Sequence, residues 1–235
     1  MTKTNDESSV AKIECVGLIM DGNRRWAKEN GLPANEGHRR GYEKLKELMR
    51  WARGAGIPHV VVYAFSTENW QRSTEEVGYL MQIFRFVLEN EINKMIEDRV
   101  CVRFVGDISR FSEDIQKMMA HAENESSVGE YDSTLYLAMS YGGRAEIVAA
   151  TNSLLKEGKR SVSEEEFSRM LWTKNMPDPD LIIRTGGEMR LSNFLPWQSV
   201  YSELFFVDTK WPEFTKEEFE TILTEFSMRE RRRGK

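Results

Sequence analysis

The sequence predicts an α/β fold, in which helices surround a central, mostly parallel β-sheet. Short apolar, β-branched runs alternate along the chain with longer amphipathic runs, and this order of elements is typical of parallel sheets. The short runs are continuously apolar, which favours strands covered on both faces. At 235 residues, 40% of them hydrophobic, the chain is long enough to bury the core of such a domain.

Five apolar runs are predicted to be strands, and six amphipathic runs are predicted to be helices. The predicted strands are residues 13–20, 59–65, 100–106, 134–140 and 181–184. The predicted helices are residues 37–55, 74–99, 109–125, 143–157, 163–172 and 215–231. Residues 1–12 are polar, and we expect them to form a disordered leader before a single domain over 13–235.

The predicted helix that begins at Thr74 carries one broad apolar stripe. Its apolar residues recur at helical spacing and are Val77, Leu80, Met81, Phe84, Val87, Leu88, Ile92, Met95 and Ile96. A stripe of this kind is usually part of the core. Spacing alone does not separate a core face from the wall of an apolar binding site.

Composition excludes several classes of protein. A formal net charge of -5 argues against a general nucleic-acid binder, whereas arginine clusters on an acidic chain suit a small polyanionic ligand. The two cysteines, Cys15 and Cys101, stand in apolar runs and are expected to be buried free thiols of a cytoplasmic protein. With only three histidines, the chain lacks the usual ligands of a structural zinc site. No run approaches the ~18 apolar residues of a membrane span.

Polar residues follow the first predicted strand. Asp21 and Gly22 come directly after it, and Asn23, Arg24 and Arg25 follow. A carboxylate, a glycine that allows close backbone approach and paired arginines at the carboxyl end of a strand suit an anion and a metal ion. The same residues are equally compatible with an Asx turn flanked by solvated arginines.

Two further clusters contain polar residues that local structure alone does not explain. His38, Arg39 and Arg40 open the predicted helix 37–55, where positive charge opposes the helix dipole and a bound polyanion would remove that cost. After the second strand, hydroxyl, carboxylate, amide, indole and guanidinium groups gather within seven residues. A helix cap and a buried tryptophan account for part of that cluster only. Its members are Ser66, Thr67, Glu68, Asn69, Trp70 and Arg72.

The last cluster follows the strand 181–184. Two glycines allow tight backbone approach, while Arg184, Arg190 and Ser192 offer donors for phosphate oxygens. Glu203 is a candidate second carboxylate for a metal ion, since Mg²⁺ takes one or two protein carboxylates and fills its other positions with phosphate and water.

These blocks together resemble the cis-prenyltransferase family, which includes undecaprenyl and dehydrodolichyl diphosphate synthases. The resemblance runs from about Val16 to the C-terminus and is carried by six blocks in order. They are MDGNRRWA, GHRRG, YAFSTENWQR, YGGR, DLIIRTGGEMRLSNFLPWQ and YSELFF.

The resemblance implies a zeta fold with a hydrophobic tunnel and an enzyme that condenses isopentenyl diphosphate with an allylic diphosphate. It implies Mg²⁺ as cofactor, a homodimer, no nucleic-acid partner, and peripheral membrane contact through the lipid product. Asp21 would handle Mg²⁺ and the leaving diphosphate, with Glu203 as a second metal ligand, and Asn69, with Ser66 nearby, would assist proton removal. Residues 22–25 and His38 would cradle the allylic diphosphate.

The resemblance assigns the remaining motif positions to substrate binding as well. Arg184, Arg190 and Ser192 would hold the diphosphate of isopentenyl diphosphate. The remaining substrate-lining positions are Trp26, Thr67, Glu68, Trp70, Arg72 and Leu191. An Arg-Xaa-Gly element of the family, which reaches toward the partner subunit, is matched by residues 232–234.

One position departs from the family pattern. Many relatives carry a basic residue four positions before the histidine of the GHRRG block, where this chain has Ala34. One diphosphate contact is then missing or supplied by Arg39 or Arg40.

Two other functions compete with the enzyme assignment. A non-catalytic accessory subunit of a heteromeric prenyltransferase typically lacks the acidic residue and part of the basic set, which this chain retains. A generic nucleotide enzyme would need a glycine-rich Walker or Rossmann loop, and the sequence contains none. The paired DDxxD motifs of the trans-prenyltransferases are also missing.

Overall fold

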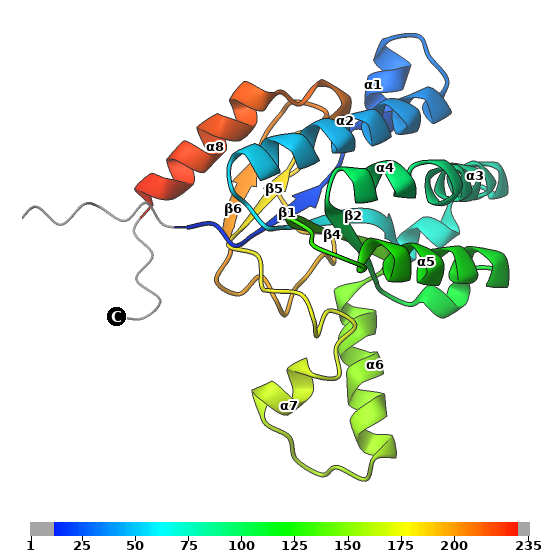
Figure 1. The fold of residues 1–235 in the computed structure, drawn as a ribbon, viewed down its shortest axis with the longest axis vertical. Coiled ribbons are helices and arrows are strands. Elements are labelled where there is room, and N and C mark those ends of the chain that lie inside the picture. Colours follow the sequence, from blue (N-terminus) through cyan, green and yellow to red (C-terminus); the bar gives the residue numbers. More distant parts are fainter. Residues whose placement is uncertain (1–11, 230–235) are drawn as a thin grey trace, which may run out of the picture.

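The computed structural model describes residues 12–229 and contains a six-stranded, all-parallel sheet in the order β3-β4-β2-β1-β5-β6 (Figure 1). This confirms the predicted α/β fold. The strands are β1 (Cys15–Ile19), β2 (His59–Ser66), β3 (Val100–Val105), β4 (Ser133–Tyr141), β5 (Leu181–Arg184) and β6 (Glu203–Phe206).

Helices connect the strands and cover the sheet (Figure 1). The α-helices are α1 (Asn23–Glu29), α2 (Ala34–Gly54), α3 (Thr74–Asn90), α4 (Ile92–Glu97), α5 (Glu113–Ser126), α6 (Gly143–Lys156), α7 (Glu164–Ser168) and α8 (Lys216–Met228). Three short 3₁₀ helices are η1 (Thr67–Gln71), η2 (Ile108–Arg110) and η3 (Trp211–Glu213). None of the helices within residues 12–229 has both the length and the hydropathy that crossing a bilayer requires.

The alternation of side chains along each strand divides the core into two faces. Val16 and Leu18 pack in the cluster that α2 and α8 cover, while Cys15 and Ile19 belong to the cluster on the opposite face. Because both faces are covered, β1 is buried at every position, as its continuous apolar run indicates. Cys15 and Cys101 are buried free thiols, as predicted.

Several elements and boundaries differ from the sequence prediction. The edge strand β6 and the short helix α1 were not predicted, and α2 begins at Ala34 rather than Gly37. The predicted helix 74–99 is divided into α3 and α4 at Glu91, whose side chain is nearly buried. Hydrogen bonds from Tyr42 and Lys94 hold that carboxylate, so a contact with α2 accompanies the interruption.

The connection from β1 to α1 needs a glycine. Gly22 has a φ of 107°, in the left-handed region, and a Cβ there would lie 2.8 Å from Cβ of Lys210. The neighbouring carbonyl oxygen of Asp21 accepts hydrogen bonds from the Thr185 hydroxyl at 2.8 Å and the Trp211 N–H at 3.0 Å. Segments far apart in sequence are thereby tied together where β1 and β5 end.

Trp211 joins this crossing point to α2. Its indole N–H donates to the carbonyl oxygen of Gly41 at 2.7 Å, and its ring stacks on Phe214 with a centroid distance of 6.0 Å. The side chain is fully buried. Trp211 therefore combines a large apolar contact with a hydrogen bond that is buried away from solvent.

We expect Trp211→Ala to lower the free energy of unfolding by about 3–5 kcal/mol, because it leaves a large cavity and an unpaired carbonyl. Urea unfolding followed by circular dichroism measures the change. Phe86→Ala is the matched control, since Phe86 is 55% exposed and its loss should cost little. Equal midpoints for the two variants would contradict this role of Trp211.

Candidate active site

A buried ion pair joins the ends of two neighbouring strands. Asp21 follows β1 and Arg184 ends β5, and the Arg184 Nη2 lies 2.9 Å from Oδ2 of Asp21. The Arg184 side chain is only 5% exposed, so this charge needs partners inside the protein. The parallel pairing of β1 with β5 is what brings the two residues to the same edge of the sheet.

The other groups around Asp21 complete a ring of donors. Its Oδ1 accepts from the Gly22 N–H at 2.7 Å and lies 3.3 Å from Nη2 of Arg25. Arg184 Nη1 donates to the Ser192 hydroxyl at 2.8 Å and also to the carbonyl oxygen of Arg190. Arg184 Nε is buried and has no hydrogen-bond partner among the described residues, so the guanidinium retains an unused donor.

The loop after β5 holds an uncommon backbone. Ser192, Asn193 and Leu195 all have positive φ values, of 49°, 69° and 50°. Non-glycine residues in this region are uncommon, and they cluster at functional sites. Asn193 fixes the loop from both sides: its amide donates to Glu68 at 2.9 Å, and its Oδ1 accepts from the Arg144 N–H at 2.9 Å.

A second charged cluster gathers around Glu76 on α3. Its carboxylate lies 2.8 Å from Arg72, 3.5 Å from Arg24 and 3.8 Å from His38. Burial, together with the charge of Arg72, lowers the pKa of His38 to about 4 against the opposing effect of Glu76. The imidazole is therefore neutral near pH 7 in the free protein.

The segment after β2 is shaped by one side chain. Asn69 Oδ1 accepts a hydrogen bond from the Ser66 N–H at 3.0 Å, which closes η1 onto the strand end. The Asn69 carbonyl oxygen is thus engaged, and its amide group is what it offers to a ligand. Thr67 donates to Glu68 at 3.1 Å in the same turn.

Two polar cavities meet at Asp21 and Arg72, which line both. The first cavity, of ≈660 Å³, is lined by the α1 cations Arg24, Arg25 and Lys28, and by His38. The second, of ≈540 Å³, is lined by Arg184, Ser192, Asn193, Ser66, Glu68, Asn69 and Tyr63. A carboxylate and an arginine therefore stand between two spaces of anion-binding character.

An apolar cavity of ≈120 Å³ adjoins the first polar cavity and shares Met20, Asn23 and His38 with it. We call it the apolar channel. The stripe predicted from Thr74 contributes Leu80, Phe84, Val87, Leu88 and Met95 to its wall. The stripe therefore serves as core and as cavity lining at once.

The structure does not bring Glu203 to Asp21. Glu203 is the first residue of β6 and pairs with Leu181, the first residue of β5, whereas Asp21 lies beyond the last residue of β1. In a parallel sheet these are opposite ends, and Glu203 instead lies 2.7 Å from Arg229. Within one chain the two carboxylates therefore lie apart, because Glu203 starts strand β6, which the sequence analysis did not recognise.

Other predicted positions also lie apart from the cavities. Arg39 pairs with Glu36 on the exposed side of α2. It therefore does not replace the basic residue that many relatives carry at the position of Ala34. Because α2 starts at Ala34, His38 lies in its second turn and the argument from the helix dipole does not apply. Trp70 packs against Phe65 and donates to Ser140 at 3.0 Å, as a core residue does.

The remaining predicted residues occupy intermediate places. Arg190 is exposed and its guanidinium pairs with Glu188, while its backbone accepts from Arg184. Leu191 packs against the core cluster that contains Phe194. Trp26 lies half-buried on α1, outside the linings of the three cavities. Residues 232–234 lie outside the described part of the chain.

Four lining or neighbouring residues were not predicted. Lys28 supplies a cation to the first cavity from a helix that the sequence analysis did not recognise. Glu76 was not singled out, because an acidic residue in the first turn of a helix such as α3 is common. Tyr63 and Asn193 stood inside the quoted motifs, and Asn193 could have been selected, since it follows Ser192 directly.

Comparison with known proteins decides the family. The family model described as putative undecaprenyl diphosphate synthase matches residues 19–234. The chain belongs to this family. It is 46% identical over 224 residues to an isoprenyl transferase of Thermotoga maritima, covering 93% of this chain and 95% of the relative. An isoprenyl transferase of Agrobacterium fabrum is 42% identical over 237 residues, covering 98% and 95%.

Solved structures agree with this prenyltransferase assignment. A lavandulyl diphosphate synthase from Lavandula x intermedia, in complex with dimethylallyl diphosphate, superimposes with a TM-score of 0.89 at 32% identity, covering 95% of this chain and 98% of that one. A probable undecaprenyl diphosphate synthase from Campylobacter jejuni has a TM-score of 0.80 at 31% identity, covering 95% and 99%. The chain is a prenyltransferase with the fold of these enzymes.

The low pKa of His38 makes stability depend on pH. Below pH 6.5 the unfolded chain binds a proton at His38 that the folded protein binds only near pH 4, so the free energy of unfolding falls as pH decreases across this window. We expect His38→Gln to remove this loss, on the order of 2–3 kcal/mol by pH 4.

Urea unfolding at several pH values measures the difference between the variant and the wild type. His121→Gln is the control, because His121 is 73% exposed on α5 and its replacement leaves the buried His38 imidazole in place. Parallel profiles for wild type and His38→Gln would contradict the assigned burial of a neutral imidazole.

Proposed function

We propose that this prenyltransferase condenses isopentenyl diphosphate with an allylic diphosphate, repeatedly and in cis geometry, to build a polyprenyl diphosphate. The observation that carries the proposal is that two polar cavities meet at Asp21 and Arg72, and that one of them continues into the apolar channel. One space suits each diphosphate, and the channel suits a hydrocarbon tail. Such a division of polar and apolar space fits a substrate with an anionic head.

The cavity beside the channel is the better place for the allylic diphosphate, because the tail then enters the channel through His38 and Met20. Arg24, Arg25 and Lys28 would stabilise the negative charge that grows on the leaving diphosphate. Glu76 occupies Arg24 and Arg72 in the free protein, so the incoming diphosphate competes with a carboxylate for these cations.

Isopentenyl diphosphate would then occupy the second cavity. Arg184 lines this cavity together with Ser192 and Asn193 and would pair with the diphosphate. In the reaction the C1–oxygen bond of the allylic substrate breaks, a carbon–carbon bond forms to the alkene, and the C2 proton of the isopentenyl unit passes to an oxygen of the departing diphosphate. Asn69 lines this cavity and would position the isopentenyl group rather than accept that proton, since its side-chain carbonyl oxygen already accepts from the Ser66 N–H.

The donor set fits a Mg²⁺ ion only in part. Asp21 is a single carboxylate, and no group of three or more acidic, histidine or cysteine residues able to hold a metal occurs within residues 12–229. Mg²⁺ typically uses one or two carboxylates with phosphate oxygens and water. Asp21 would therefore hold a Mg²⁺ that arrives with a diphosphate, and the ion would neutralise charge on the leaving group.

A homodimer is part of the proposal. β6 is the outer strand of the sheet, so its free edge and the residues beside it are open to a second chain. Val200 and Tyr201 precede β6 and are each 68% exposed. Exposed apolar side chains beside an outer strand fit a symmetric interface.

We expect Tyr201→Asp to shift the protein from dimer to monomer, because it places a charge in the proposed interface. Size-exclusion chromatography with light scattering measures the mass. Tyr131→Asp is the control, since Tyr131 is 46% exposed before β4, away from β6. A Tyr201→Asp variant with the same mass as the wild type would refute this interface.

We expect Asp21→Asn to lower kcat about 100- to 1000-fold, because a neutral amide no longer attracts the metal ion or pairs with Arg184. Incorporation of labelled isopentenyl diphosphate into farnesyl diphosphate, with Mg²⁺, measures the rate. Asp208→Asn, an exposed carboxylate on the neighbouring loop, is the control. A folded Asp21→Asn variant with wild-type kcat would overturn the proposal.

A further inference from the structure

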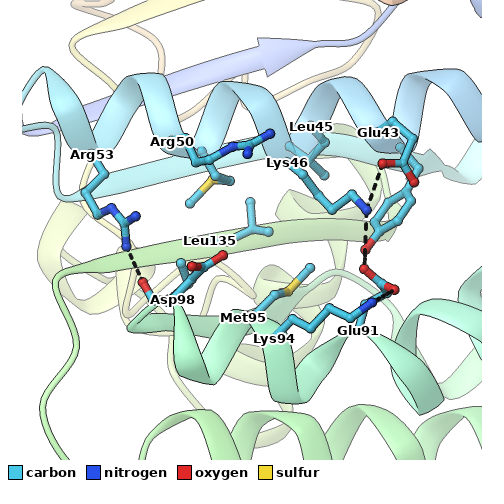
Figure 2. A pocket seen from close by; sticks show the side chains of 13 residues that line it. Glu43, Leu45, Lys46, Arg50, Arg53, Glu91, Lys94, Met95, Asp98 and Leu135 are labelled. Carbon is cyan, nitrogen blue, oxygen red and sulfur yellow. Dashed lines mark hydrogen bonds and ion pairs between the residues drawn. The ribbon is translucent and has the colours of Figure 1, made fainter.

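A further cavity, separate from the two polar cavities and the apolar channel, lies between α2 and α4, and its volume is ≈340 Å³ (Figure 2). We call it the distal cavity. Successive turns of α2 line the apolar channel first and the distal cavity next: His38, Gly41 and Tyr42 belong to the channel, and Met49, Arg50 and Arg53 to the distal cavity. Along α2, the distal cavity therefore lies beyond the apolar channel, on the side away from the polar cavities.

The two spaces share a wall. Tyr42, Leu45, Met95 and Leu135 line both the apolar channel and the distal cavity. Three of these residues are apolar, and Figure 2 shows Leu135 at the back of the distal cavity between α2 and α4. An apolar chain that reaches Leu45 and Met95 from the channel thus finds further apolar surface beyond them.

The apolar channel is small. At ≈120 Å³ it is close to the roughly 150 Å³ of an apolar cavity that accommodates one benzene molecule. It therefore holds about one five-carbon unit. A tail that grows by repeated addition of such units needs more space, and the distal cavity is the larger adjoining one.

A polar bridge lies at the boundary between the two spaces. The Tyr42 hydroxyl donates to Oε2 of Glu91 at 3.1 Å, and Lys46 Nζ donates to the same oxygen at 3.4 Å. Lys94 Nζ donates to the other oxygen at 2.7 Å. Glu91 stands at the interruption between α3 and α4, and its side chain is only 7% exposed. The bridge thus joins α2 to the start of α4.

We propose that the distal cavity receives the far end of the growing polyprenyl chain, and that the Tyr42–Glu91 bridge is the gate that limits product length. This inference rests on the proposed chain elongation and adds a residue-level determinant of specificity to it. The tail passes between α2 and α4 when Tyr42 turns aside. The bridge is then lost at the cost of one hydrogen bond, because Glu91 keeps Lys94.

The charges of the distal cavity fit a hydrocarbon tail better than an anionic ligand. Lys46 and Lys94 are neutralised by Glu91, and Lys46 also by Glu43 at 2.8 Å. Arg53 donates to the backbone oxygen of Asp98. An anion would have to displace these partners, whereas a tail needs only the apolar floor formed by Leu45, Met95 and Leu135.

Two variants test the gate from opposite directions. Met95→Trp fills the wall that both spaces share, and we expect it to shift the main product to a chain at least one five-carbon unit shorter. Tyr42→Phe removes the hydroxyl from the bridge, and we expect a shift of at least one unit toward longer chains. Asn93→Trp is the matched control, because it adds the same bulk on the exposed face of α4.

Purified full-length proteins are incubated with farnesyl diphosphate, labelled isopentenyl diphosphate and Mg²⁺, and the dephosphorylated products are separated by chromatography. Opposite shifts in Met95→Trp and Tyr42→Phe, with a wild-type pattern in Asn93→Trp, support the gate. A wild-type pattern in both active variants overturns it while leaving the proposed function intact. Should Met95→Trp fail to fold, Tyr42→Phe alone decides. A wild type that incorporates no isopentenyl unit removes the proposed function, and the gate with it.

Discussion

The buried ion pair between Asp21 and Arg184 is the constraint on which the site depends. A guanidinium that is 5% exposed is stable only with partners, and the parallel pairing of β1 with β5 supplies a carboxylate 2.9 Å away. The same carboxylate faces both polar cavities, so one structural requirement places the functional group. A different strand order would separate Asp21 from Arg184, and the two residues would no longer form one site.

In the proposed reaction, the same arrangement would accommodate the anionic heads and the apolar tail of the substrates. Cations stand at the carboxyl ends of the strands, where helix α1 begins, and apolar side chains of α2, α3 and β4 lie behind them. Both groups are anchored by the same elements, since α2 carries His38 toward the first cavity and Leu45 toward the channel. The proposed head and tail sites are therefore held by the same helix.

Sequence reasoning succeeded where the signal is local. The strand ends could be read from continuous apolar runs. Asp21 directly follows one of them and Arg184 ends another, so the rule for parallel sheets places these two residues together. It failed where the answer depends on pairing partners. The place of Glu203 could not be predicted, because a four-residue edge strand leaves little periodic signal and the start of β6 decides which end of the sheet Glu203 faces. Lys28 and Glu76 required contacts between elements that no spacing reveals.

The most direct test of the central claim is whether the two diphosphates bind together on either side of Asp21. Calorimetry with Mg²⁺ would titrate isopentenyl diphosphate into protein saturated with an unreactive thiodiphosphate analogue of the allylic substrate. Two separate cavities predict one isopentenyl diphosphate bound per chain with the analogue in place. Mutual exclusion of the two ligands would contradict the account.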